Sequence, residues 1–207
     1  MSSEQFFDQV AKDWDKMRVN FYSDNVREKA FAVAGVVTGR LAADIGAGTG
    51  FITTGLLQHG LKVIAVDRSE AMLVEMQRKF AGSGEIDYRL GEAEELPIGN
   101  EEVDYVFANM YLHHVETPLD AIHEMVRILK PKGRLTITDA DEHQFEFLRI
   151  EHHDRWLGFK REDVKNWFIA AGLHNVVVDY IGENCTVPSQ TSVDQACISI
   201  FVASGEK

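Results

Sequence analysis

Short apolar runs alternate with amphipathic segments through the middle of the chain, and this alternation limits the folds that are open to it. The apolar runs are RLAADI (40–45), KVIAVD (62–67), IDYRL (86–90), VDYVFAN (103–109) and RLTITD (134–139). Each is short enough for a strand and apolar enough to be buried on both faces, as parallel strands are. The pattern therefore predicts a doubly wound α/β fold, with helices on both faces of a mostly parallel sheet.

The segments between these runs carry the features of helices. Ser69 is placed to cap a helix whose Met72 and Met76 fall on one face. Pro118 suits the first turn of another helix, whose Met125 lies on the apolar face and which the sequence KPKG ends. These helices supply the crossovers that parallel strands require.

The two ends of the chain differ from its middle. The first forty or so residues contain no strand-like run and are predicted to form helices that fold over the ligand edge of the sheet. Near the C-terminus, NVVVDYI (175–181) and ACISIFVAS (196–204) follow one another with no helix between them. They are expected to pair antiparallel at an edge of the sheet.

Composition narrows the classes of function. The formal net charge of −12 disfavours nucleic acid and anionic lipid as partners, because both are bound through dense Lys and Arg. No apolar run approaches the ~20 residues that cross a bilayer, and MSSEQFFDQV does not resemble a secretion signal, so a cytoplasmic location is expected. Cys185 and Cys197 form no CxxC pair and are interpreted as reduced thiols.

A glycine-rich loop follows the first predicted strand. In GAGTGF, Gly46, Gly48 and Gly50 allow a sharp turn, close approach of a ligand to the backbone, and free amides at the start of the next helix. A dinucleotide fingerprint requires its third glycine at position 51, which is Phe51 here. The loop therefore predicts a nucleotide-type cofactor other than a dinucleotide.

Two acids indicate the chemistry of that cofactor. Asp44 precedes the loop, where a carboxylate suits a cofactor that carries cationic groups and no pyrophosphate. Asp67 ends the second strand, where it can accept hydrogen bonds from both ribose hydroxyls. As isolated residues, Asp67 is equally compatible with a cap on the helix near Ser69, and Asn109 with ordinary turn chemistry.

These motifs resemble, in order, those of the class I S-adenosylmethionine-dependent methyltransferases. DIGAGTG is similar to their glycine motif, AVDRSEAML to the second-strand acidic motif, and LGEAEELPI to the loop after the third strand. ANMYLHHV resembles the end of their fourth strand, and HEMVRILKPKGRLTITD the approach to the fifth. FFDQVAKDWD is similar to the N-terminal element of the branch that includes the ubiquinone and menaquinone C-methyltransferases. The resemblance covers nearly the whole chain.

The resemblance implies a Rossmann-like, seven-stranded, mostly parallel sheet with an antiparallel C-terminal edge strand and an N-terminal helical cap. It divides a single methyltransferase domain, 1–207, into the cap (1–39), the cofactor-binding core (40–139), and helices with a C-terminal hairpin (140–207). The implied cofactor is S-adenosylmethionine, with S-adenosylhomocysteine as product. As its binding residues the resemblance implies Asp44, Gly46, Gly48, Gly50, Asp67, Arg68, Met72, Glu92, Ala93 and Asn109.

The implied roles differ along the cofactor. Asp44 and Asn109 would lie near its methionine part, Asp67 would hold the ribose, and Glu92 and Ala93 would flank the adenine. Glu92 stands where the family usually has Asp, so its carboxylate is carried on one extra methylene.

The methyl acceptor is expected to be a small molecule, bound by a monomer or homodimer. Asn109 is followed by Met-Tyr and not by the Pro-Pro-aromatic sequence of relatives that methylate DNA and protein amino groups. Aromatic residues close to the site (Phe7, Trp14, Tyr22, Tyr111) are compatible either with an apolar acceptor pocket or with plain core. A metalloid or thiol acceptor, and a sensor or assembly factor that binds the cofactor without transferring methyl, remain alternatives.

The histidines are the candidates for acceptor chemistry. His113 and His114 follow the fourth strand, where one of them can act as a base or can simply bond to the turn. A helix over 143–157 would separate His152 from His153 by about 100°, so no metal site is expected there. The candidate catalytic residues are His113, His114 and His153, and for His153 a packed or capped helix end is the favoured alternative.

Overall fold

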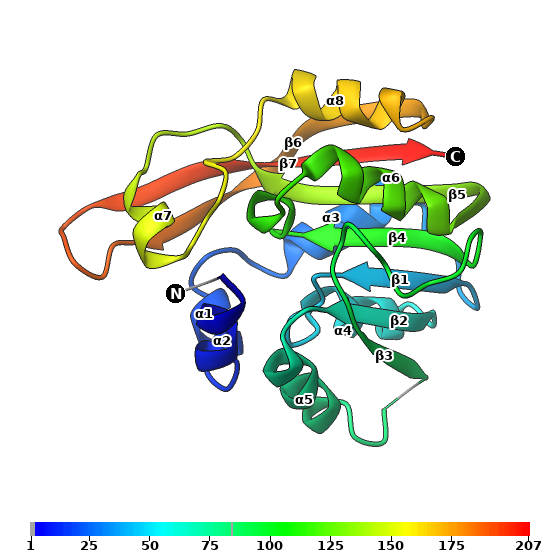
Figure 1. Cartoon of the computed structure of the whole chain (residues 1–207), viewed down its shortest axis with the longest axis horizontal. Helices are drawn as coiled ribbons and strands as arrows, with labels where there is room; N and C mark the ends of the chain where they lie inside the picture. The colour runs from blue at the N-terminus through cyan, green and yellow to red at the C-terminus, as the bar shows by residue number, and fades with distance from the viewer. Residues whose placement is uncertain (1–2, 84) are drawn as a thin grey trace.

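The computed structural model describes residues 3–83 and 85–207. Among these residues a seven-stranded sheet runs in the order β3-β2-β1-β4-β5-β7-β6 (Figure 1). Strands β1 to β5 are parallel, β7 runs antiparallel between β5 and β6, and β6 forms the edge. The predicted Rossmann-like, mostly parallel sheet with antiparallel C-terminal pairing is confirmed.

The strands match the apolar runs closely in the middle of the chain and extend further toward the C-terminus. Their bounds are β1 Leu41–Ile45, β2 Lys62–Asp67, β3 Ile86–Leu90, β4 Val103–Asn109, β5 Leu129–Ala140, β6 His174–Pro188 and β7 Gln195–Glu206. The helices are α1 Ser3–Val10, α2 Trp14–Arg18, α3 Asn25–Ala34, α4 Phe51–Gln58, α5 Glu70–Lys79, the 3₁₀ turn η1 Leu112–His114, α6 Pro118–Ile128, α7 Phe147–Glu151 and α8 Arg161–Ala170.

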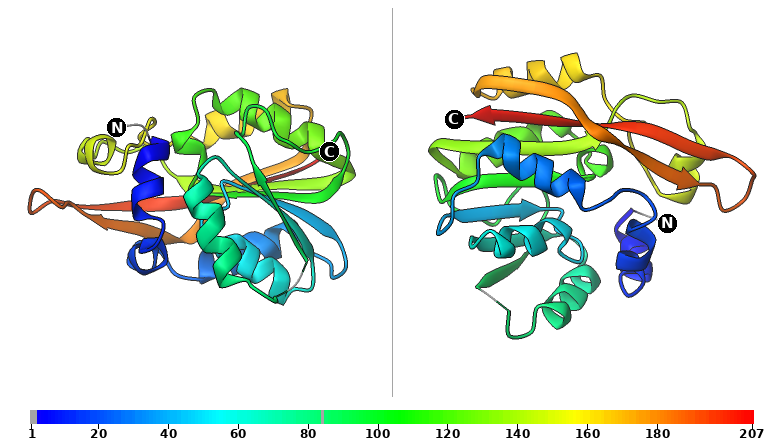
Figure 2. Two further views of the ribbon diagram at one scale, coloured as in Figure 1. Left: turned by 60° about the horizontal axis from the view of Figure 1, so that its bottom comes forward. Right: turned by 180° about the vertical axis from the view of Figure 1, so that it is seen from behind.

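Helices cover both faces of the sheet and enclose two apolar cores (Figure 2). Side chains from α6 and α8 pack on one face and include the fully buried Met125 and Phe168. Side chains from α3, α4 and α5 pack on the other, around Phe31 and Met76. Successive residues of β4 enter opposite cores because strand side chains alternate between the two faces.

The helix starts that the sequence predicts are present. The Ser69 hydroxyl accepts a hydrogen bond from the Met72 backbone N–H at 3.1 Å and caps α5. Pro118 occupies the first turn of α6. Both helices lead the chain back across the sheet and leave the loops before them at the carboxyl ends of the strands.

Helices α1 and α2 lie beyond the carboxyl ends of the parallel strands, where a helical cap was predicted from the sequence (Figure 1). Side-chain hydrogen bonds hold them to the core. Asp8 accepts from the Ser69 hydroxyl at 2.5 Å, and Asp15 accepts from the Thr49 hydroxyl at 2.6 Å. No helix in the described part of the chain is long and apolar enough to span a bilayer.

The helix predicted over 143–157 is wrong in length. Only Phe147–Glu151 is helical, because His153 adopts a left-handed conformation with φ of 59° and Gly158 turns the chain with φ of 69°. Residues after α7 instead hydrogen-bond to η1, where the His113 carbonyl accepts from the backbone N–H groups of Arg155 at 3.1 Å and Trp156 at 3.0 Å. The helical separation of His152 and His153 expected from the sequence is therefore not formed.

Candidate active site

A cavity lies over the glycine loop, between the carboxyl ends of β1, β2 and β4 and the N-terminal helices. With its mouth it encloses about 650 Å³. We call it the first cavity, and its lining residues are Phe7, Trp14, Arg18, Tyr22, Asp44, Gly46, Ala47, Gly48, Thr49, Phe51, Ile52, Asp67, Arg68, Met72, Asn109, Met110, Tyr111 and His114. Seven of the ten predicted cofactor residues are among them: Asp44, Gly46, Gly48, Asp67, Arg68, Met72 and Asn109.

The glycines of the loop serve two different purposes. Gly46 and Gly48 line the first cavity, and a Cβ at Gly46 would overlap the ring of Tyr111. Gly50 does not line it. A Cβ at Gly50 would lie 2.5 Å from the ring of Phe80, so this glycine makes room for the packing of α5. Gly50 thus has a packing role in this structure, and its contact with the cofactor stays a prediction.

Asp67 links the second strand to the glycine loop. Its Oδ2 accepts a hydrogen bond from the Gly48 backbone N–H at 2.7 Å, and its Oδ1 accepts from the Ser69 N–H at 2.9 Å. The helix cap itself is Ser69, so Asp67 does not have the capping role that was the alternative to ribose binding. Burial raises the pKa of Asp67, and these backbone donors oppose that effect.

Asp44 is a nearly fully buried carboxylate at the end of β1. Its Oδ2 accepts hydrogen bonds from the Thr53 N–H at 3.0 Å and the Thr53 hydroxyl at 2.7 Å. Burial raises the pKa of Asp44 to about 7, although the Thr53 donors act in the opposite direction. A cationic group placed in the first cavity would favour the ionised form.

The cap contributes a cation and aromatic rings to the first cavity. The guanidinium of Arg18 lies over the rings of Phe51, at 4.3 Å, and Tyr22, at 5.6 Å. Its Nε is buried and has no hydrogen-bond partner among the described residues. All four aromatic residues that the sequence placed near the site line this cavity: Phe7, Trp14, Tyr22 and Tyr111.

The residues predicted to flank adenine lie to one side. Ala93 is fully buried in the core beneath α6, and Glu92 lines a shallow pocket that it shares with Arg68, Tyr111 and His114. The ring of Tyr111 borders both this pocket and the first cavity. Neither Glu92 nor Ala93 lines the first cavity in this arrangement of Tyr111.

A second cavity adjoins the first and encloses about 630 Å³ with its mouth. It is formed by α1, α2, η1, the segment around α7, and the strands β6 and β7. The residues that line it are Phe6, Phe7, Trp14, Phe21, Tyr22, Met110, His113, His114, Ala140, His143, Leu148, His152, Asp154, Gly158, Cys185, Val187 and Ile198. Five of them also line the first cavity: Phe7, Trp14, Tyr22, Met110 and His114.

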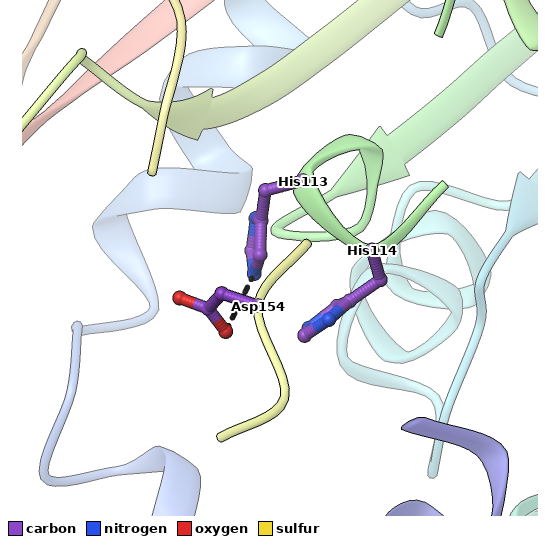
Figure 3. A group of neighbouring side chains, drawn as sticks. All are labelled: His113, His114 and Asp154. Carbon is purple, nitrogen blue, oxygen red and sulfur yellow. Dashed lines mark ion pairs between the residues drawn. The ribbon is translucent and has the colours of Figure 1, made fainter. Parts of the chain in front are cut away.

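His113 stands between two carboxylates at the second cavity. Its Nδ1 lies 2.7 Å from Asp139 Oδ1, and its Nε2 lies 3.8 Å from Asp154 Oδ1 (Figure 3). Burial lowers the pKa of His113, but the two carboxylates outweigh burial and raise it to about 9. Burial raises the pKa of Asp154 to about 6, and His113 opposes that rise.

The other histidines considered from the sequence differ in which cavity they line. His114 lines both cavities, and burial together with the neighbouring His113 holds its pKa well below the usual range. His152 faces the second cavity with its ring 5.8 Å from that of Phe21. His153 lines neither cavity, and its ring lies 5.3 Å from that of Phe6.

The two cysteines do not lie in one site. Cys185 is buried and lines the second cavity, and burial raises its pKa to about 12. Cys197 is exposed on β7, paired in register with Thr186. Adjacent positions on a strand face opposite sides, so only one thiol reaches the cavity.

Several residues of the second cavity were not singled out from the sequence. Asp139 ends the predicted strand 134–139, and a carboxylate at the end of a parallel strand was a usable indication of a site residue. Asp154 and His143 had no such indication, because the segment around α7 takes its path from tertiary contacts.

The chain is similar in sequence to known methyltransferases. The family model described as "Methyltransferase domain" matches residues 43–137. A demethylmenaquinone methyltransferase from Clavibacter sepedonicus is 31% identical over 138 residues, which are 64% of this chain and 56% of that protein. The chain thus spans about half the length of the curated relatives that it matches.

Solved structures share the fold at low sequence identity. A SAM-dependent methyltransferase from Aquifex aeolicus superposes with a TM-score of 0.70 at 21% identity, covering 96% of this chain and 97% of that one. The [4+2]-cyclase SpnF superposes with a TM-score of 0.77 at 15% identity, covering 100% and 97%. These comparisons agree with the resemblance indicated by the sequence motifs: residues 43–137 match the methyltransferase-domain model, and the chain shares its fold with solved S-adenosylmethionine-dependent methyltransferases.

Proposed function

We propose that the protein binds S-adenosylmethionine in the first cavity and transfers its methyl group to a small molecule held in the second. The observation that carries this proposal is the junction of the two cavities, which share Phe7, Trp14, Tyr22, Met110 and His114. A methyl group at this junction would face a nucleophile on its other side. An in-line displacement requires that arrangement.

The residues of the first cavity fit the cofactor group by group. Asp44 suits the ammonium of its methionine part, and the buried Nε of Arg18 suits the carboxylate of the same part. Asp67 suits the ribose hydroxyls, because it lines the cavity and each of its oxygens, which accepts one backbone N–H, can accept a further hydrogen bond. Gly46 and Gly48 place no side chain in the cavity, although the ring of Tyr111 packs against Gly46 in this structure.

The adenine end is the part of the proposal that requires movement. Tyr111 separates the first cavity from the pocket that contains Glu92. We propose that this ring turns away from Gly46 when the cofactor binds and that Glu92 and Ala93 then border the adenine. Gly50 has no direct part in this arrangement, since it packs against Phe80.

The second cavity suits an acceptor with a flat apolar body and one polar atom. Phe6, Phe21 and Leu148 supply apolar wall, whereas His113, His114 and Asp154 gather at one end. The cofactor supplies an electrophilic methyl group, and the protein supplies position, exclusion of water and a polar end for the nucleophile. Of the three histidines proposed for catalysis, His113 and His114 border the acceptor. His153 lacks access to it, and His152 takes its place in the proposal.

Two alternatives are less well supported. A metalloid acceptor held by thiolates is disfavoured, since Cys185 alone reaches the second cavity. Methyl transfer also does not follow from the fold by itself, because SpnF is a cyclase of the same fold. A protein that binds the cofactor without transferring methyl would use the first cavity in the same way.

Product formation decides among these possibilities. The purified protein is incubated with S-adenosylmethionine labelled in the methyl group and with a panel of quinols, phenols, thiols, amines and carboxylic acids. We expect labelled product and S-adenosylhomocysteine in equal amounts with at least one class of acceptor. Binding of S-adenosylhomocysteine without turnover on any class would favour the sensor. The cytoplasmic location and the monomer or homodimer state stay predictions.

A further inference from the structure

We propose that His113, His114 and Asp154 bind a divalent transition-metal ion, best satisfied by zinc, at the polar end of the second cavity. Each offers one ligand atom, and these atoms lie within 4.8 Å of one another (Figure 3). Two imidazoles and a carboxylate form a three-residue set that leaves a further coordination position open. Sequence spacing does not reveal this set, because Asp154 comes from the segment after α7 and the histidines from η1.

The first argument is the orientation of His113. Its Nδ1 is 2.7 Å from Asp139 Oδ1, and Asp139 is itself fixed by accepting the Ala140 N–H at 2.7 Å. This bond leaves Nε2 directed at Asp154, 3.8 Å away, which is too far for a hydrogen bond. A carboxylate behind a histidine, holding its other nitrogen toward an ion, is the usual support of a metal ligand.

The second argument is the lack of other partners for the ligand atoms. The Nδ1 of His114 is buried without a hydrogen-bond partner among residues 3–83 and 85–207. In the same part of the chain the Asp154 carboxylate, 10% exposed, accepts no hydrogen bond and has His113 Nε2 at 3.8 Å as its ion-pair partner. Buried polar atoms are rarely left without a partner, because desolvating them is costly. An ion between the three side chains would satisfy both groups.

The third argument is that the backbone holds the two halves of the site together. The Arg155 and Trp156 N–H groups donate to the His113 carbonyl, and the Trp156 indole N–H donates to the Val115 carbonyl at 2.9 Å. These bonds fix the segment that carries Asp154 against η1. The ligand atoms around one zinc ion lie roughly 3.3 Å apart. Small side-chain rotations would therefore bring these three ligand atoms to coordination distance.

The site opens toward the acceptor, since all three residues line the second cavity. This step rests on the proposed function: the open position would take an oxygen or sulfur lone pair of the acceptor. The ion would lower the pKa of that hydroxyl or thiol, and its proton would pass to solvent. The lone pair would then form the bond to the methyl carbon while the carbon–sulfur bond breaks with its electrons left on sulfur.

Metal binding is measured directly on the full chain, without a histidine tag, by calorimetry with zinc and by the visible spectrum of the cobalt(II) form. We expect one zinc per chain and cobalt absorption bands of a four- or five-coordinate site. Asp154→Asn and His114→Ala should each weaken zinc at least tenfold. His123→Ala, which removes an exposed histidine on α6, is the matched control and should not change zinc binding.

Binding of S-adenosylhomocysteine to the same samples separates this proposal from the previous one. A wild-type protein that binds S-adenosylhomocysteine but not zinc would overturn the metal site alone. Zinc bound equally well by wild type and Asp154→Asn would also overturn it. A protein that binds zinc through these residues but not S-adenosylhomocysteine would leave the metal site standing and contradict the proposed cofactor.

Discussion

The side-chain amide of Asn109 donates a hydrogen bond to the Tyr22 hydroxyl at 3.0 Å, and this bond joins the end of β4 to the segment that follows the N-terminal helices. The Asn109 carbonyl oxygen in turn accepts from the Thr138 hydroxyl at 2.8 Å. Tyr22 lines both cavities. The wall between the two cavities is therefore held by a polar chain that runs from β5 through β4 into the cap.

Tyr22→Phe should lower the free energy of unfolding by ~0.5–1.5 kcal/mol, because it removes the hydrogen bond of the half-buried Asn109 amide. Asn109→Ala removes the same bond from the other side. The two changes together should therefore cost about 1 kcal/mol less than the sum of the single changes. Denaturant unfolding of the four proteins in this cycle measures the coupling, and strictly additive losses would show that the bond contributes nothing.

Cofactor affinity should depend on pH through Asp44. Its pKa of about 7 lies above the usual value, so the protonated form is favoured in the folded protein, and its contribution to stability falls as pH rises through that value. A cationic ligand prefers the ionised form. Affinity for S-adenosylhomocysteine should therefore fall up to about tenfold per pH unit below 7 and level off above it. Calorimetry from pH 5.5 to 8 tests this.

Asp44→Asn supplies the control for that measurement. The asparagine cannot ionise, so its affinity should be low and nearly constant between pH 5.5 and 8. Equal pH profiles for the two proteins would mean that another group controls binding.

The contact of the cap with the glycine loop should slow cofactor release. Asp15 accepts a hydrogen bond from the Thr49 hydroxyl and pairs with Lys79 at 2.8 Å. Asp15→Ala should raise the dissociation rate of S-adenosylhomocysteine by about three- to tenfold, because it removes the hydrogen bond to Thr49 together with the partly exposed pair with Lys79. Stopped-flow fluorescence of Trp14, which lines the first cavity, follows the release.

Asp13→Ala is the matched control for this change. Asp13 pairs with Lys16 at 2.8 Å on the exposed side of the cap, away from the loop. Its loss should leave the dissociation rate unchanged. Similar dissociation rates for the two variants would contradict the claim that the contact of Asp15 with the glycine loop slows cofactor release.

Gly50→Ala should destabilise the fold more than its backbone conformation alone explains. Gly50 and Gly172 both have φ of 90°, but a Cβ at Gly50 would meet Phe80 at 2.5 Å, whereas a Cβ at Gly172 would meet nothing within 4 Å. Gly172→Ala therefore measures the backbone cost alone. We expect Gly50→Ala to cost ~1–3 kcal/mol more in unfolding free energy. Equal losses would show that α5 moves freely to accept the methyl group.

The sheet was predictable because buried parallel strands are continuous apolar runs. The predicted ranges 62–67, 86–90 and 103–109 coincide with β2, β3 and β4. Strands β6 and β7 are longer than predicted because they continue as a paired hairpin that includes polar residues, such as Asn184 opposite Ser199. Hairpin pairing supplies the hydrogen bonds there, so no apolar run marks it.

The site was predictable only in part, and for a similar reason. Asp44, Asp67 and Asn109 end strands, and strand ends of a doubly wound sheet meet at one edge. Asp154 falls within the predicted helix 143–157, yet backbone bonds to the His113 carbonyl hold that segment in an irregular path. Spacing along the chain carries no information about such a contact.

Calorimetric titration of S-adenosylhomocysteine into wild type, Asp67→Ala and Asp87→Ala tests the central claim most directly. Asp87 lies on the neighbouring strand β3, where it is exposed and paired with Arg89, so its variant controls for loss of an acid. We predict that wild type and Asp87→Ala bind equally well and that Asp67→Ala binds about 100-fold more weakly, because two charged hydrogen bonds are lost. Unchanged affinity in a folded Asp67→Ala protein would contradict the assignment of the first cavity to this cofactor.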